Sequence, residues 1–539
     1  MNALHFPRHI TWRSLLALFF IFSTAAPAQT NAPVSAPKKT TSEQRASRAF
    51  EVVRANPLEL RAFLVRMPKG ADLHNHLYGA IYAETWIRDG AEDHLCVDLA
   101  KLSFFKAQAV TFSIPPQPIC GDGNIPAAQA LKDQHLYDAL IDSFSMRGFT
   151  PAPGTTAHDH FFDAFARFGG NLDESRHLGE WLDELATRGA AQNEQYLELM
   201  HTPDFRHAAA LAKGIGWPDS VSPSSDFNKL RDELLAHGLR DEVATASAAL
   251  DQAETLRKQR EHCGQKEEGS ACKVQIRFLY QILRGFPKEQ VFAQTLLGFE
   301  TASADPRFVG INMVMPEDAY ISMSDYALQM KMVGFLHGLY PKVHITLHAG
   351  EIAPGLVTYE GLCCHVRLAV DEGHAERIGH GVDVMYENQP YDLLKEMSAK
   401  HVMVEINLTS NDVILGVSGK NHPLPVYRKF GVPVALSTDD EGVSRIDLTH
   451  EYVRAAETYA LSYADLKQMV RTGLEHSFLP GASLWNSPDV FTKTVSACTD
   501  EKLGDEKPST ACGSFLKSSE KAQQQWELER RFSAFESRF

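Results

Sequence analysis

The residues best suited to chemistry begin with two histidines that are separated by a single residue. His74 and His76 lie in ADLHNHLYGA (71–80), directly after the apolar run FLVRMPKG. Because side chains alternate between the two faces of a strand, both imidazoles would point the same way. Such a pair could hold a metal ion or lie on an exposed strand. The pair alone does not decide between these two interpretations.

Further polar residues follow short apolar runs later in the chain. They are His348 in VHITLHAG, His380 in RIGHGVDV, and Asp439 with Asp440 in VPVALSTDD. Three imidazoles and one carboxylate suit a Zn²⁺ ion that keeps one position open for water, and water bound there ionises near neutral pH. The predicted ligands are His74, His76, His348 and Asp439. Glu351, three residues after His348, is placed to protonate a substrate.

The segments that carry these residues alternate between strand and helix. Strands are predicted at 308–315, 343–350, 377–384, 402–409 and 432–440, at 194–202 and at the first histidine pair. Segments with helical period separate them, which indicates parallel strands joined by crossovers. The polar residues gather at the carboxyl ends of the strands, where (β/α)8 barrels build their active sites. We therefore predict an α/β fold, a (β/α)8 TIM-type barrel. Seven of its strands are identified, and the eighth is sought near residues 160–170, although residues 161–168 also have helical patterning.

The start of the chain has the pattern of a secretory signal. Arg8 and Arg13 precede an apolar run of about a dozen residues, and small residues follow up to Ala28. The apolar run is too short to span a bilayer. We expect an exported protein, periplasmic or extracellular, without membrane attachment after cleavage. The predicted divisions are a signal peptide (1–28), a flexible linker (29–41), an N-terminal helical extension (42–70), the barrel (71–490) with an insertion at about 91–133, and a C-terminal tail with a helix (491–539).

The cysteines and the net charge bear on compartment and partners. The chain has eight cysteines. In an oxidising compartment, we expect six of them to form three local disulfide bridges. These pairs are Cys96 with Cys120, Cys263 with Cys272, and Cys498 with Cys512. The adjacent Cys363 and Cys364 are expected to be buried free thiols. The net charge of -15 argues against a nucleic-acid partner, which would favour a basic face.

Four motifs occur together in a fixed order: MPKGADLHNHL, HAGE, RIGHGV and STDDEG. In this combination they resemble the adenosine deaminase family of the amidohydrolase superfamily, over about residues 45–490. The export signal and the cysteine-bounded excursion resemble its secreted, growth-factor-related branch. The resemblance implies one Zn²⁺ per chain and hydrolysis of a purine nucleoside, adenosine or 2′-deoxyadenosine, to the inosine product and ammonia. The secreted relatives dimerise through N-terminal helices, so 42–66 is the predicted homodimer interface.

The resemblance also implies a role for each residue of the site. His74, His76, His348 and Asp439 would bind the zinc. Glu351 would donate a proton to purine N1, His380 would orient the attacking water, and Asp440 would hydrogen-bond purine N7. Two positions depart from the family pattern. Tyr78 stands where an Asp often meets the ribose hydroxyl, and Met315 stands where a Gly backbone often touches purine N3. Both are predicted to contact substrate, and they leave the identity of its sugar end open.

Three alternatives stay open at this point. The first is a deaminase of a modified adenine nucleoside. The second is a two-metal amidohydrolase of other specificity, in which His380 is a ligand and a Lys or Glu near the end of the fourth strand bridges the metals; Glu317 lies two residues beyond Met315. The third is a secreted protein that binds nucleosides without turnover. A cytidine-deaminase site is excluded because its Pro-Cys-x-x-Cys signature is missing.

Overall fold

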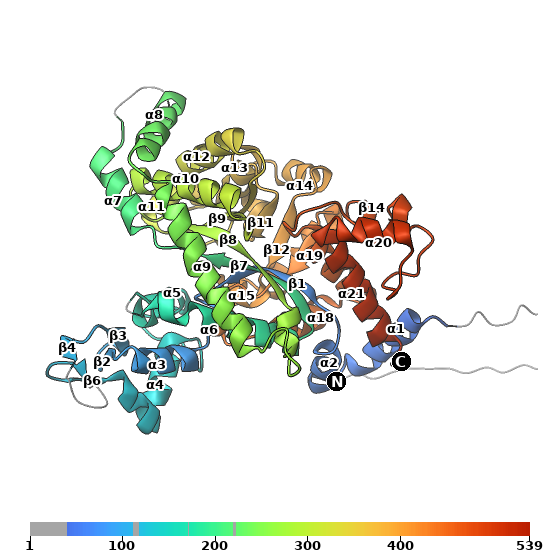
Figure 1. The fold of residues 1–539 in the computed structure, drawn as a ribbon, viewed down its shortest axis with the longest axis horizontal. Coiled ribbons are helices and arrows are strands. Elements are labelled where there is room, and N and C mark those ends of the chain that lie inside the picture. Colours follow the sequence, from blue (N-terminus) through green and yellow to red (C-terminus); the bar gives the residue numbers. More distant parts are fainter. Residues whose placement is uncertain (1–39, 111–117, 171, 219–222) are drawn as a thin grey trace, which may run out of the picture. The chain divides into compact units, whose positions relative to one another are not determined.

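Eight parallel strands form the central sheet of the computed structural model, which describes residues 40–539 apart from 111–117, 171 and 219–222 (Figure 1). The strands follow one another in the order β1 (Gly70–His76), β7 (Glu194–His201), β8 (Gln275–Leu283), β9 (Phe308–Val314), β10 (His344–Ala349), β11 (Arg377–His380), β12 (Met403–Ile406) and β13 (Val434–Leu436). A parallel bridge between Asn75 and Asp439 joins the first strand to the segment after the last. The predicted barrel is therefore confirmed.

The eighth strand is not where the sequence placed it. Residues 157–168 form the helix α5 (Ala157–Phe168), which begins at a capping box between Thr156 and Asp159. Its buried residues Phe161, Ala164 and Phe168 recur at helical spacing. The missing strand is β8 instead, which follows a charged stretch and whose apolar run is interrupted by polar side chains.

Helices alternate with the strands and cover the outside of the barrel (Figure 1). Those between β7 and β10 are α7 (Arg206–Ile215), α8 (Pro223–Ala236), α9 (Asp241–Arg260), α10 (Lys288–Ala304), α11 (Tyr320–Ser324) and α12 (Tyr326–Leu339). Those after β10 are α13 (His365–Asp371), α14 (Pro390–Ala399), α15 (Leu408–Leu415), α16 (Leu424–Phe430), α17 (Glu441–Ser444), α18 (Leu448–Tyr459) and α19 (Tyr463–Glu475). Because all eight strands are parallel and joined by helical crossovers, their carboxyl ends lie at one face of the barrel.

A large excursion separates β1 from β7. It contains α3 (Ala83–Glu92), α4 (Gln134–Phe144), α5 and α6 (Glu174–Ala191). Between α3 and α4, the strands β2 (Cys96–Asp98), β3 (Ser103–Phe105) and β6 (Asn124–Pro126) pair into a small antiparallel sheet, and β4 (Ala109–Val110) pairs with β5 (Pro118–Ile119). These short strands lie in the segment that the sequence assigns to an insertion, and they pair with one another instead of with the barrel.

Both ends of the described chain pack against α19. The helices α1 (Ser42–Val53) and α2 (Pro57–Leu64) contribute Phe50 and Phe63, whose rings contact Tyr463 at 6.4 and 6.1 Å. The tail helix α21 (Glu520–Glu536) adds Phe535, 6.3 Å from the same tyrosine. Among the described residues, every helix is too short or too polar to cross a bilayer. The predicted signal peptide lies outside the described residues.

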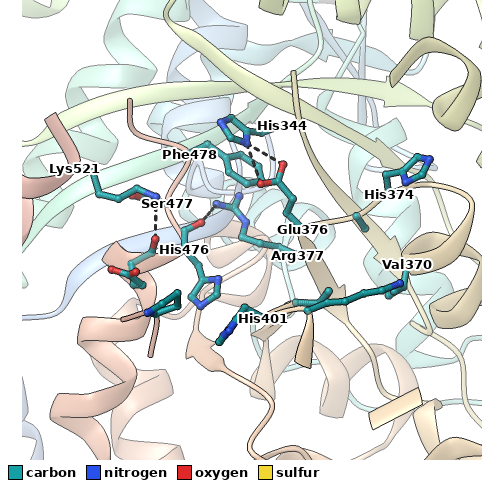
Figure 2. A pocket seen from close by; sticks show the side chains of 15 residues that line it. His344, Val370, His374, Glu376, Arg377, His401, His476, Ser477, Phe478 and Lys521 are labelled. Carbon is teal, nitrogen blue, oxygen red and sulfur yellow. Dashed lines mark hydrogen bonds and ion pairs between the residues drawn. The ribbon is translucent and has the colours of Figure 1, made fainter. Parts of the chain in front are cut away.

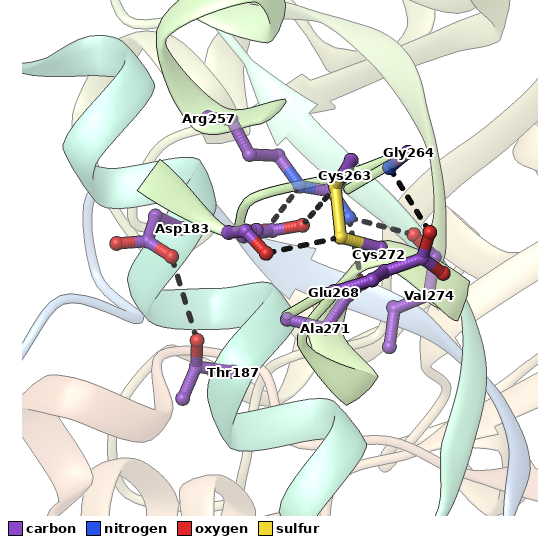
Figure 3. The surroundings of a disulfide bond; sticks show 10 residues. Asp183, Thr187, Arg257, Cys263, Gly264, Glu268, Ala271, Cys272 and Val274 are labelled. Atoms are coloured by element: carbon purple, nitrogen blue, oxygen red, sulfur yellow. Dashed lines mark hydrogen bonds and ion pairs between the residues drawn. A yellow bond between two sulfur atoms is a disulfide. The ribbon is translucent and has the colours of Figure 1, made fainter. Parts of the chain in front are cut away.

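All eight cysteines are paired in the structure. Three bridges, Cys96–Cys120, Cys263–Cys272 and Cys498–Cys512, are those expected. Cys263–Cys272 closes the turn between α9 and β8, where Arg257 donates to the carbonyls of Ala271 and Val274 (Figure 3).

The prediction of buried free thiols at Cys363 and Cys364 is wrong. The two adjacent cysteines are bridged to each other. They lie half-buried in the turn between the short helix η3 (Tyr359–Leu362) and α13. Neither thiol is therefore buried in the core, as the prediction assumed.

Candidate metal and catalytic site

The structure brings the predicted ligand residues together at the carboxyl ends of β1, β10 and β13. His76 Nε2 lies 3.1 Å from Asp439 Oδ1 and 3.2 Å from His348 Nε2, and His74 Nε2 lies 3.5 Å from the same Asp439 oxygen. All four side chains are buried. These residues are far apart in the sequence, and barrel closure makes them neighbours.

Each of the three histidines is held through its Nδ1 by an oxygen that accepts a hydrogen bond. His74 Nδ1 lies 2.6 Å from Glu405 Oε2, His76 Nδ1 lies 2.6 Å from Gln281 Oε1, and His348 Nδ1 lies 2.8 Å from Asn312 Oδ1. A proton on each Nδ1 leaves each Nε2 with a lone pair. Metal-binding histidines are oriented in this way.

The arrangement fits a cation on physical grounds. Two lone-pair nitrogens 3.2 Å apart, on His76 and His348, repel each other unless a positive charge lies against both. His74 Nε2 is buried and has no hydrogen-bond partner among the described residues. Nitrogen and carboxylate donors in this ratio match zinc. The residues present therefore fit one Zn²⁺ ion.

Two residues of the site adopt a backbone conformation that is rare without glycine. Asp439 has φ = 61° and His380 has φ = 70°. Two backbone hydrogen bonds hold Asp439 in place: its N–H donates to His74 O, and its carbonyl oxygen accepts from His76 N. Strained backbone conformations of this kind cluster at active sites and ligand-binding sites.

Glu351 and Glu317 are two acidic residues with different roles. Glu317 accepts hydrogen bonds from the backbone N–H groups of Gly350 and Glu351, at 2.9 and 2.8 Å, and another from His365. Glu317 thus fixes the loop that carries Glu351. The Glu351 side chain lies 3.6 Å from His380 Nδ1. Burial, and then the nearby carboxylates of Asp439 and Glu317, raise the pKa of Glu351 well above its ordinary value, which favours its protonated form.

Asp440 points an unpaired carboxylate oxygen into the protein interior. Its Oδ1 is buried and lacks a hydrogen-bond partner among the described residues. Burial raises the pKa of Asp440 to about 7. A carboxyl group in this state can hydrogen-bond a ring nitrogen.

The two positions that depart from the family pattern lie at the edge of this cluster. Tyr78 packs on Trp86 and Trp181, with ring centroids 6.2 and 5.4 Å away, and its hydroxyl pairs with Glu174. Met315 follows β9 and reaches Gly285, where an added Cβ would lie 3.1 Å from its terminal methyl group. Neither side chain belongs to the ligand cluster.

Sequence reasoning missed the residues that orient the histidines. Glu405, Gln281 and Asn312 lie on three strands, and Gln281 belongs to the strand that the sequence did not identify. Polar residues within an apolar strand were the available signal, because a barrel interior admits them only when they are paired.

A hollow lies at the end of the barrel opposite the ligand cluster (Figure 2). His344 begins β10 and Arg377 begins β11, so the hollow opens at the amino-terminal ends of the strands. Its polar groups are paired: His344 with Glu376, and Lys521 with the carbonyl of Glu475. That end of a barrel usually serves stability.

Comparison with known proteins decides the family. Residues 241–484 match the family model described as adenosine deaminase, and this segment includes His348, Glu351, His380, Asp439 and Asp440. Over this segment, the chain belongs to the adenosine deaminase family.

The curated adenosine deaminases match only part of this chain. The adenosine deaminase of Shewanella loihica is 35% identical over 136 residues, which are 25% of this chain and 38% of that protein. That of Escherichia coli strain SE11 is 36% identical over 137 residues, again 25% and 38%. The alignment thus spans well under half the length of these curated relatives.

A solved structure shares the fold. An amidohydrolase from Burkholderia ambifaria with bound Zn has a TM-score of 0.50 and 17% identity, covering 78% of this chain and 88% of its own. At this identity the likeness concerns the fold alone.

Proposed function

We propose that the chain is an exported, zinc-dependent deaminase that hydrolyses adenosine, and 2′-deoxyadenosine, to the inosine product and ammonia. The observation that carries the proposal is the set of three histidines whose Nδ1 atoms face acceptors and whose Nε2 atoms converge on Asp439. The match of residues 241–484 to the adenosine deaminase family model supports it.

One zinc ion would be held by His74, His76, His348 and Asp439. When bound, zinc acts as a Lewis acid that makes water acidic near neutral pH. Glu351 holds a proton that it would deliver to purine N1, so that C6 becomes electrophilic. Asp440 would hydrogen-bond purine N7 through its unpaired oxygen. His380 would donate a hydrogen bond to the water that attacks C6.

The contacts of Glu317 argue against the two-metal alternative. A bridging carboxylate from the fourth strand must present free oxygens to the metals, whereas both Glu317 oxygens accept backbone hydrogen bonds. Tyr78 favours a second candidate, a deaminase of a modified adenine nucleoside, because it replaces the carboxylate that meets the ribose in many family members.

Paired cysteines support export. All eight are bridged, and disulfides persist in oxidising compartments. Periplasmic and extracellular locations both satisfy this. We further propose a homodimer through 42–66, where Val52 and Leu58 are 77% and 80% exposed.

The experiment is release of ammonia from adenosine by the purified chain, combined with metal analysis of the same sample. Turnover with about one zinc per chain supports the proposal. Two tightly bound metals and no adenosine turnover would favour the two-metal amidohydrolase. Adenosine binding without ammonia release from the zinc-loaded protein would favour a binding protein. A parallel panel of N6-modified and 5′-modified adenosines tests the second candidate.

A further inference from the structure

We propose that Asn411 and His422 are positioning residues that fix His380 as a hydrogen-bond donor through Nε2. The two residues link His380 to the backbone of Leu424, and we call these four groups the His380 relay. The inference rests on the proposed function, because it explains how His380 takes its part in that reaction.

The relay starts at a hydrogen bond whose donor is known, the one between Leu424 and His422. Leu424 N lies 3.1 Å from His422 Nδ1, and a backbone N–H can only donate. His422 Nδ1 therefore accepts. Because a neutral imidazole carries one proton, that proton lies on His422 Nε2.

The next step fixes the orientation of an amide. His422 Nε2 lies 2.9 Å from Asn411 Oδ1 and donates to it. Amide oxygen and nitrogen are ordinarily assigned from such networks, and here the donor on His422 requires the oxygen to face it. The Asn411 NH₂ group is thereby turned the other way, toward His380.

The last step sets the tautomer of His380. Asn411 Nδ2 lies 2.9 Å from His380 Nδ1 and donates to it. Glu351 Oε1, at 3.6 Å from the same nitrogen, is too distant for a hydrogen bond in this arrangement. With Nδ1 accepting, the proton of neutral His380 lies on Nε2, which is 3.8 Å from Asp439 Oδ2 and unpartnered among the described residues.

The position of the ring proton distinguishes His380 from the three histidines beside it. His74, His76 and His348 have oxygen acceptors at Nδ1 and present lone pairs at Nε2. His380 has an N–H donor at Nδ1 and presents a proton at Nε2. A protonated Nε2 cannot ligate a metal, so the relay keeps His380 out of the ligand set. This holds although a ring nitrogen of His380 lies within 4.8 Å of ligand atoms of His74, His348 and Asp439.

Burial makes the relay effective. His380 and Asn411 are 0% exposed and His422 is 2% exposed. Asn411 lies in α15 and Leu424 begins α16, so two helices hold the chain of hydrogen bonds in place. At such positions the hydrogen-bond partners are protein groups, so the network sets the tautomer.

Asn411→Asp tests the relay with almost no change of shape. A carboxylate still accepts from His422, but it also accepts at His380, so the proton of His380 should move to Nδ1. We expect kcat to fall by at least about a hundredfold with KM for adenosine little changed. We expect the ¹⁵N resonances of His380 to exchange their donor and acceptor character in histidine-labelled protein without metal, with assignment from His380→Gln.

Two further variants complete the test. His422→Gln replaces the ring N–H with an amide N–H and should keep the wild-type tautomer and much of kcat. Asn193→Asp makes the same chemical change at the other end of the barrel, beside β7, and should alter neither reading. A His380 tautomer that Asn411→Asp leaves unchanged would overturn the inference, and so would full kcat after the tautomer has switched. Because the NMR reading needs no substrate, failure of the relay is distinguishable from failure of the proposed function.

Discussion

Gly79 and Asp440 are packed so closely that only glycine fits at residue 79. A Cβ added there would lie 1.6 Å from Asp440 Oδ1 and 2.4 Å from its Cγ. The N–H groups of Gly442 and Val443 donate to Gly79 O, so the segment after β13 is fastened to the segment after β1. The Asp440 carboxylate therefore occupies space that is free only because residue 79, in the loop after β1, is a glycine.

Gly79→Ala should displace the Asp440 carboxylate while leaving the zinc ligands in place. We expect kcat/KM for adenosine to fall by on the order of a hundredfold, with zinc content near that of the wild type. Gly338→Ala, at an exposed helix position with open space around it, is the matched control and should keep full activity. Unchanged kcat/KM in Gly79→Ala would show that Asp440 does not position the substrate.

Much of the site could be predicted from sequence because its residues follow apolar strands at fixed points. His348 is the last residue but one of β10 and His380 is the last residue of β11, and the fold places those strand ends together. What holds these rings could not be predicted. The partner of His76 is Gln281, which lies on β8. The sequence pattern of β8 is hard to recognise because polar residues interrupt it and a charged stretch precedes it. The pairing also depends on the register of strands across the barrel.

The same limit explains the misplaced eighth strand. Residues 157–168 contain closely spaced aromatic residues that suit either a strand or a helix, and the capping box at Thr156 decides for the helix. The bridge between Cys363 and Cys364 was missed for a different reason, because spacing says nothing about whether adjacent thiols lie in a core or in a turn.

Glu317 should make stability depend on pH in the acidic range. Burial alone would raise its pKa, but the hydrogen bond and charge of His365, the charge of Arg284 and the backbone N–H of Gly350 lower the pKa to about 2, from 4.5. A lowered pKa stabilises the folded state above pH 4.5, and the contribution is lost as pH falls toward 2. The shift corresponds to about 3 kcal/mol of unfolding free energy.

Urea unfolding of Glu317→Gln at several pH values measures this contribution. The variant should be less stable than the wild type at pH 7, and the difference should shrink as pH falls from about 4.5 to 2. Glu267→Gln, at an exposed position, is the control and should leave stability unchanged throughout. A difference that does not vary with pH would mean that the charge of Glu317 is not what stabilises the loop of Glu351.

Tyr78 should relax recognition at the 5′ end of the nucleoside. Its ring is held against Trp86 and Trp181, and its hydroxyl pairs with Glu174, so a charge-assisted hydrogen bond to the sugar is not supplied from this position. We expect comparable kcat/KM for adenosine and 5′-deoxyadenosine. A large loss with the 5′-deoxy compound would show that another residue makes the contact.

Glu351→Gln separates binding from proton transfer. Glutamine keeps the shape of the side chain and can still hydrogen-bond purine N1, but it has no proton to deliver. Because Glu351 lies outside the set of zinc ligands, zinc content should not fall. Adenosine affinity should stay similar, and deamination should drop by at least about a hundredfold.

The pH profile adds a second reading. Burial and neighbouring carboxylates raise the pKa of Glu351, so it stays protonated to higher pH than an exposed glutamate, and wild-type activity should decline as pH rises through that pKa. Residual activity of Glu351→Gln should lack this decline. Glu360→Gln, an exposed change in the same loop, should reproduce the wild-type profile. If Glu351→Gln lost its zinc, Glu351 would be a ligand; if it stayed nearly as active as the wild type, another group must protonate the ring.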